Sequence, residues 1–235
     1  MFKAVLFDLD GTLLDIDMEY FIPQYFRKMV IMARDAGYSI ADQLVEKVWQ
    51  ATDVMIANRD ARLLNEEVFA EHFYRNWPIP REEFEPFFER FYAEGFPQLQ
   101  IHSRPFAGIP EMMQQVFDRG LKVVVATNAV FPMIALQQRL DWAGVGHFDY
   151  ELITSYEVMH FCKPHPEYYQ EIAATIGVKP EECLMVGNDI GEDLPAGTIG
   201  MKTFLVENML IDKGQDLTPD WRGCLPDLYE FIGRL

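Results

Sequence analysis

Cysteine is scarce in this sequence. Only three cysteines occur among 235 residues, Cys162, Cys183 and Cys224, and they lie far apart along the chain. No C-x-x-C pair is present, so neither a disulfide framework nor a common zinc-binding spacing is expected. The thiols are therefore predicted to be reduced, which is typical of proteins inside the cell.

Segments that direct a chain into or across a membrane are also missing. No run of about 18 apolar residues is present, which argues against a membrane-spanning helix. The chain begins MFKAVLFDLDGT and reaches its first acidic residue at Asp8, unlike a secretory signal peptide. The expected location is the cytoplasm.

Basic residues are few. Twenty lysines and arginines stand against 37 acidic residues, a formal net charge of -17, and no basic run interrupts the excess. Such a chain repels nucleic acid and anionic lipid, so neither is an expected partner. Nothing in the sequence indicates a protein partner. A phosphorylated substrate remains compatible, because nearby lysines and metal ions set the field of a site more than net charge does.

Short apolar runs alternate with helical patterns over most of the chain. The run AVLF at 4–7 predicts a buried strand, and further strands are expected at 123–128, 150–154, 184–186 and 203–206. Helices are expected between them, at 110–119, 132–144, 166–176 and from Pro226 onward. This alternation predicts an α/β fold with a Rossmann-like parallel sheet.

The segment from about 17 to 95 has a different pattern, with apolar residues at helical spacing and no convincing strand. Gly37 is expected to end its first helix, Ser39 to cap the second and Asn65 the third, while a fourth ends at Gly95. We therefore expect a core domain of residues 1–15 and 101–235, interrupted by a helical cap domain of residues 16–100.

Polar residues follow the predicted strands at four places. Because ligands bind beyond the carboxyl ends of parallel strands, these residues are expected to form one site. They are Asp8 with Asp10, Thr127 with Asn128, Lys163, and Asp189 with Asp193. Clustered carboxylates need a cation, and oxygen ligands suit Mg²⁺. With a lysine and a hydroxyl beside them, they predict a phosphoryl-transfer site in which one carboxylate attacks phosphorus.

Four motifs carry a family resemblance. FDLDGTLLD resembles the first motif of the haloacid dehalogenase superfamily, and the strand end VVVATN resembles the second. KPHPE is similar to the third motif and VGNDIGED to the fourth. The four occur in the family's order and span nearly the whole chain. The resemblance is to the phosphatase branch, with a helical cap between the first and second motifs.

The resemblance implies roles for these residues. Asp8 would be the nucleophile and a magnesium ligand. Asp10 would bind magnesium through its carbonyl and act as general acid and then base. Thr127, Asn128 and Lys163 would hold the phosphoryl group of a small phosphorylated metabolite, and the cap would close over it.

The fourth motif departs from the common pattern. Many relatives carry an acid directly after the glycine and a second acid five residues later. Here Gly187 is followed by Asn188, with Asp189 next and Asp193 four residues further on. We favour Asp189 as the metal ligand, with Asp193 beside the ion or one layer behind it. The alternative is that Asn188 fills the usual ligand position.

Other functions are compatible with parts of the pattern. A phosphomutase uses the same four motifs, and only the cap separates it from a phosphatase. A haloacid dehalogenase lacks the acid two residues after the nucleophile, so Asp10 argues against that activity. A binding protein that keeps the fold without catalysis is disfavoured by the intact set Asp8, Asp10, Thr127 and Lys163.

Overall fold

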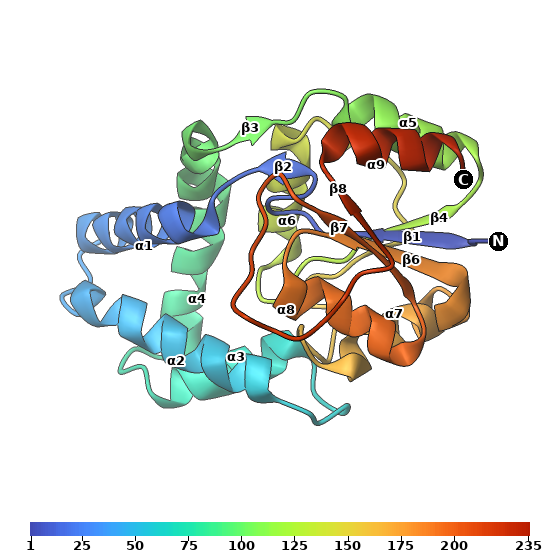
Figure 1. Cartoon of the computed structure of the whole chain (residues 1–235). Coiled ribbons are helices and arrows are strands. Elements are labelled where there is room, and N and C mark those ends of the chain that lie inside the picture. The colour runs from blue at the N-terminus through green and yellow to red at the C-terminus, as the bar shows by residue number, and fades with distance from the viewer.

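A parallel sheet of six strands forms the centre of the protein in the computed structural model, which describes residues 1–235 (Figure 1). The strand order is β5-β4-β1-β6-β7-β8, and every neighbouring pair is parallel. The strands are β1 (Ala4–Phe7), β4 (Lys122–Val125), β5 (Leu152–Ile153), β6 (Cys183–Gly187), β7 (Lys202–Val206) and β8 (Trp221–Gly223). The predicted α/β fold is confirmed. Strand β8 was not predicted.

Helices cover both faces of the sheet. Along β1, Val5 and Phe7 belong to one apolar cluster and Ala4 and Leu6 to another, because successive side chains of a strand point to opposite faces. The first cluster includes side chains of α5 (Ile109–Asp118), α6 (Met133–Trp142) and α9 (Leu225–Gly233). The second includes side chains of α7 (Pro166–Thr175). Figure 1 shows α5 and α9 above the sheet and α7 below it.

The chain changes direction across the sheet at β1. It runs from β1 to β4 and β5 on one side, then returns to β6, β7 and β8 on the other. In the register, Phe7 lies opposite both Val125 and Val186. The residues that follow these three strands therefore leave the sheet at the same edge. Such a reversal point is where open α/β sheets bind ligands.

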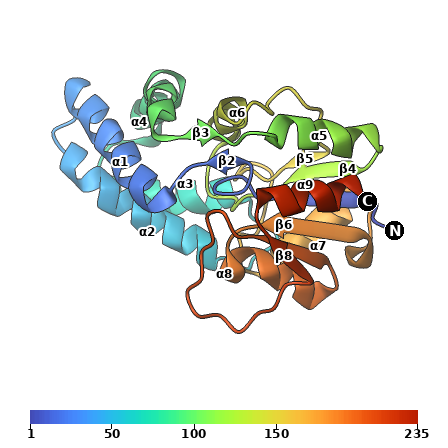
Figure 2. The same ribbon diagram turned by 45° about the horizontal axis from the view of Figure 1, so that its top comes forward.

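A helical insert lies at one end of the sheet (Figures 1 and 2). It contains α1 (Met18–Asp35), α2 (Leu44–Ala57), α3 (Asn65–Arg75) and α4 (Arg81–Arg90), then a π-helical turn at Phe91–Gly95 and a 3-10 helix at Phe96–His102. The predicted absence of strands between 17 and 95 is confirmed. Where the chain enters and leaves the insert, β2 (Leu14–Asp15) pairs antiparallel with β3 (Arg104–Pro105). This short pair was not predicted.

The helix ends of the insert were predicted only in part. Gly37 follows the end of α1 with φ +88, as expected for a glycine beyond a helix end. Ser39 does not cap the second helix, because a 3-10 turn at Ala41–Gln43 precedes α2. Asn65 is the first residue of α3 rather than its cap. Its side-chain amide donates instead to the carbonyls of Ala129 and Phe161, so tertiary contacts replace the predicted capping bond.

None of the helices combines the length and the apolar character needed to cross a membrane.

Leu184 tests how the sheet contributes to stability, since it lies in β6 and is 0% exposed. We expect Leu184→Ala to lower the free energy of unfolding by about 2–5 kcal/mol, because it leaves a cavity in the packed layer. Ile101→Ala is the control, since Ile101 is 82% exposed and its loss should change stability by less than about 0.5 kcal/mol. Urea unfolding measures both, and equal losses would contradict the assignment of the core.

Candidate active site

The loop after β1 is held against the loop after β6. Gly11 has φ +86, and a Cβ atom added there would lie 2.4 Å from the Asn188 side-chain nitrogen, so only glycine fits. The buried Thr12 hydroxyl lies 3.0 Å from Asn188 Oδ1 and 3.3 Å from Asp8 Oδ2. The Asp8 amide donates to the carbonyl of Val186 at 2.8 Å. These contacts fix where the Asp8 carboxylate lies at the edge of the sheet.

Lys163 joins two of the predicted carboxylates. It comes from the loop between β5 and α7, and only 1% of its side chain is exposed. Its ammonium lies 2.8 Å from Asp8 Oδ1 and 2.6 Å from Asp193 Oδ1. One cation therefore bridges the first and fourth motifs.

The charges in this cluster do not balance. Burial raises the pKa of Asp8 to about 8, the Lys163 ammonium opposes that rise, and the carboxylates of Asp193 and Asp10 add to it. Burial alone would lower the pKa of Lys163, but Asp193 and Asp8 hold it well above its usual value. Lys163 thus stays charged. A further cation beside Asp8 would favour the ionised carboxylate that attack on phosphorus requires.

Thr127 and Asn128 follow β4, at the same edge of the sheet. The carbonyl of Thr127 accepts hydrogen bonds from the hydroxyls of Thr154 at 2.8 Å and Tyr168 at 2.6 Å. No protein group bonds the Thr127 hydroxyl, which leaves it available to a ligand. The Asn128 amide donates to Glu192 at 3.2 Å, and its side-chain oxygen is buried without a partner.

Asn188, Asp189 and Asp193 of the fourth motif have different surroundings. Asn188 accepts from Thr12 and donates to the carbonyl of Met209 at 2.6 Å, so both ends of its amide are engaged. Both carboxylate oxygens of Asp193 are also engaged, one by Lys163 and one by the Asp189 amide at 2.9 Å.

Asp189 caps a short helix. Its Oδ1 accepts from the amides of Gly191 and Glu192, at 2.7 and 3.0 Å, at the start of α8 (Ile190–Asp193). No hydrogen bond engages its Oδ2. Asp189 therefore keeps an oxygen for a ligand, whereas both oxygens of Asp193 are engaged.

Asp10 does not pair with Lys163. Its Oδ2 accepts a hydrogen bond from the guanidinium of Arg139 on α6, whose side chain is 0% exposed. The Arg139 guanidinium also lies over the ring of Phe131, 4.4 Å from its centroid. Sequence reasoning missed Arg139. The available signal was a charged residue within the apolar face formed by Ala135, Leu136 and Leu140.

The donor set can be tested for a fit to Mg²⁺. No three acidic, histidine or cysteine side chains are grouped closely enough to enclose an ion by themselves. Mg²⁺ does not need such a cage, because it keeps several waters and adds phosphate oxygens to one or two carboxylates. Asp10 Oδ1 is buried without a partner, and the three carboxylates of Asp8, Asp10 and Asp193 are paired with only two cations, Lys163 and Arg139. The set fits a divalent cation in both charge and donor type.

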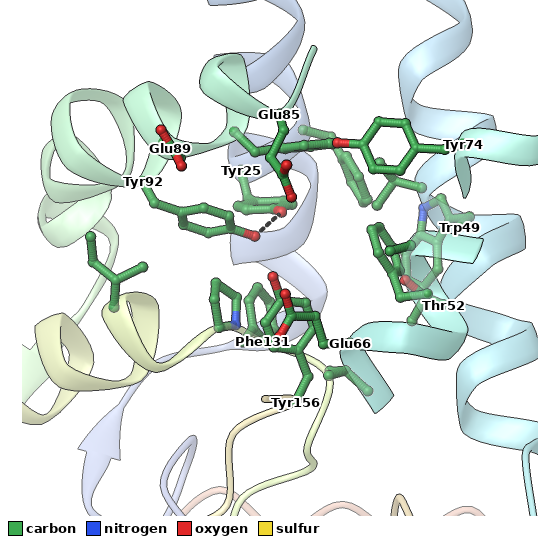
Figure 3. Close-up of a pocket in the computed structure, with 18 of the residues that line it drawn as sticks. Tyr25, Trp49, Thr52, Glu66, Tyr74, Glu85, Glu89, Tyr92, Phe131 and Tyr156 are labelled. Carbon is green, nitrogen blue, oxygen red and sulfur yellow. Dashed lines mark hydrogen bonds between the residues drawn. The ribbon is translucent and has the colours of Figure 1, made fainter. Parts of the chain in front are cut away.

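A pocket of about 370 Å³ lies between the helical insert and the loops that follow β4 and β5 (Figure 3). All four insert helices contribute to it, and the core contributes Val130, Phe131, Pro132, Ile134 and Tyr156. The hydroxyls of Tyr25 and Tyr92 are 2.9 Å apart within it. Phe131 forms part of its wall and also contacts Arg139. The pocket is therefore connected through one aromatic ring to the contact between Arg139 and Asp10.

Comparison with known proteins gives a consistent result. A family model described as haloacid dehalogenase-like hydrolase matches residues 2–198. Glyceraldehyde 3-phosphate phosphatase of Methanothermobacter thermautotrophicus is 25% identical over 232 residues, covering 92% of this chain and 90% of that protein. Phosphoglycolate phosphatase of Thiobacillus denitrificans is 27% identical, covering 87% of this chain and 82% of that protein.

A solved structure has the same fold. The structure of a haloacid dehalogenase-type phosphatase from Thermococcus onnurineus superposes on this chain with a TM-score of 0.60. The two sequences are 22% identical, and the match covers 98% of both chains.

A comparison of Gly11 with Gly37 separates the cost of backbone strain from the cost of a side-chain clash. Gly11 has φ +86 and no room for a Cβ atom, whereas Gly37 has φ +88 and nothing within 4 Å. We expect Gly37→Ala to cost about 1 kcal/mol of unfolding free energy from strain alone. Gly11→Ala should cost more, because it also displaces Asn188. Urea unfolding measures both, and equal costs would show that the loop does not press on Asn188.

Proposed function

Because this chain belongs to the haloacid dehalogenase-like hydrolases, we propose that it hydrolyses a small phosphate monoester through a phospho-aspartate formed on Asp8. The observation that carries the proposal is the Asp8 carboxylate at the end of the central strand, 2.8 Å from the buried ammonium of Lys163. The phosphatase names of two relatives support the same reaction class.

In the first half of the proposed reaction, an Asp8 oxygen attacks phosphorus and the ester P–O bond breaks. Lys163 and the free hydroxyl of Thr127 hold the oxygens of the transferring phosphoryl group, with Asn128 beside them. Asp10 donates a proton to the departing alcohol oxygen. The products are the free alcohol and a phosphoryl group joined to Asp8.

In the second half, water attacks the phosphorus of the phospho-aspartate. Asp10, now deprotonated, accepts a proton from that water, and the bond between Asp8 and phosphorus breaks. Inorganic phosphate leaves and Asp8 is restored. Asp193 takes no direct part, because its two oxygens hold Lys163 and the Asp189 amide in place.

Mg²⁺ is the metal that these donors suit. We propose that Asp8, the Asp10 carbonyl and Asp189 hold it, with Asn188 and Asp193 in supporting positions. The Asp189 oxygen that makes no hydrogen bond supports this choice over Asn188, whose amide is fully engaged. When bound, the ion neutralises phosphoryl charge and favours the ionised form of Asp8.

We further propose that residues 16–100 act as a cap over a core formed by 1–15 and 101–235. The antiparallel pair of β2 and β3 ties together the two segments that connect these parts. The pocket walls come from the helical segment and from core loops alike. Closure of such a cap would exclude water from the first half of the reaction.

The function is tested by measuring phosphate release from a panel of phosphate monoesters. We expect turnover with Mg²⁺, its loss on chelation and its return when Mg²⁺ is restored. Asp8→Asn should reduce kcat by more than about a thousandfold, because the amide cannot act as the nucleophile. Asp15→Asn is the control, since Asp15 lies in β2 and its nearest cation, Arg104, is 3.8 Å away. Near-normal kcat in Asp8→Asn would exclude the covalent mechanism.

The contact between Arg139 and Asp10 generates a second prediction. We expect Asp10→Asn to lower kcat by about a hundredfold or more, because it removes the acid and base. Arg139→Lys should also lower kcat, since its shorter donor cannot hold Asp10 in the same direction. If Arg139 acts through Asp10, the double variant will be no slower than Asp10→Asn. Fully multiplicative losses would mean that the two side chains act independently.

A further inference from the structure

The pocket beneath the helical insert has a mainly apolar wall that is rich in aromatic rings. Rings of Tyr25, Trp49, Phe88, Tyr92, Phe131 and Tyr156 line it, from α1, α2, α4, the π-helical turn at Phe91–Gly95 and the core loops. Figure 3 shows the pocket. Its volume of about 370 Å³ is within the usual range for small-molecule sites. Trp49 is 44% exposed, so part of the wall can be reached from solvent. A pocket of this kind suits a bulky ligand with apolar or aromatic surface.

The charge of the pocket is negative. Three carboxylates line it, Glu66, Glu85 and Glu89, against one guanidinium, that of Arg81. Arg81 is already paired with Glu85 at 2.6 Å. Glu66 accepts no hydrogen bond, and burial together with the carboxylate of Glu157 raises its pKa. In Figure 3, Glu66 and Glu85 lie on opposite sides of the pocket.

Aromatic faces and carboxylates attract the same kind of ligand. The face of an aromatic ring carries partial negative charge and draws a cation within about 6 Å, most strongly when water is excluded. An anionic group would be repelled by the same ring faces and carboxylates. The combination of rings and excess carboxylates therefore selects for positive charge as well as apolar bulk.

We infer that the pocket binds the leaving group of a phosphate monoester whose alcohol carries an ammonium group on an aromatic or bulky apolar body. This inference rests on the proposed phosphatase function and names the substrate class for the same site. The phosphate would lie at Asp8 and Lys163. The alcohol would extend past Phe131, whose ring joins the pocket to the Arg139 and Asp10 contact.

The proposed substrate class differs from that of the Thiobacillus denitrificans relative. The name of the Thiobacillus denitrificans protein identifies phosphoglycolate as its substrate, and glycolate is a small carboxylate. A leaving group of that type would leave most of the pocket empty and would face Glu66 and Glu85. We therefore expect phosphoglycolate to be a poor substrate of this chain.

A matched series of para-substituted benzyl phosphates tests the selectivity. The substituents are trimethylammoniomethyl, methyl and carboxylate, which change the charge but not the reacting bond. We expect kcat/KM from phosphate release with Mg²⁺ to fall in that order, with about a tenfold or larger span. Equal values, or a preference for the carboxylate ester or phosphoglycolate, would overturn the inference.

Variants on the insert assign the effect to the pocket. Glu66→Gln should shrink the ratio of kcat/KM for the ammonium ester to kcat/KM for the methyl ester by about threefold or more. Glu82→Gln is the control, since Glu82 is exposed on α4 and does not line the pocket. An unchanged ratio in Glu66→Gln would contradict its role in charge selection.

Direct binding separates failure of this inference from failure of the proposed function. Benzyltrimethylammonium should change the fluorescence of Trp49, and Trp49→Phe should remove that part of the signal. Benzenesulfonate, of similar size and opposite charge, should bind at least about tenfold more weakly. If the cation binds and no ester is hydrolysed, the phosphatase function fails and only the charge preference of the pocket stands. If esters are hydrolysed and the two probes bind alike, the pocket inference fails.

Discussion

The buried ammonium of Lys163 is the interaction on which the geometry of the site depends. It bridges Asp8 after β1 and Asp193 after β6, from a loop that follows β5. Burying a charge is costly unless it is paired, and removing one partner of a buried pair typically costs about 3–5 kcal/mol. The three segments are therefore held together across the sheet. The same contact that aligns the proposed nucleophile also stabilises the reversal point of the fold.

The acidic residues of the site are divided by their hydrogen bonds. Asp193 has both oxygens engaged, and Asn188 has both ends of its amide engaged. Asp8, Asp10 and Asp189 each keep an oxygen that accepts no backbone or cationic donor. Carboxylates that look alike in the sequence therefore differ in whether they have an oxygen left to bind a ligand.

The helical insert is tied to the core at the pocket. Asn65 at the start of α3 donates to the carbonyls of Ala129 and Phe161, and the amide of Glu66 donates to the carbonyl of Tyr156 at 2.9 Å. One apolar cluster also runs from the sheet into the insert, including Phe7 and Phe73. The pocket and the edge of the sheet are therefore structurally connected.

The sequence alone determined the features that depend on local pattern. The spacing of apolar residues predicted the sheet, the helical insert and the strand ends that carry Asp8 and Thr127. Four motifs in order predicted the hydrolase family, which is confirmed. Only the tertiary structure decided the pairing of Arg139 with Asp10, the hydrogen bonds from the Asn65 side chain to the core, and the aromatic pocket. These depend on contacts between residues 129 and 64 positions apart, which no local propensity encodes. Their partners become neighbours only when the sheet and insert pack together.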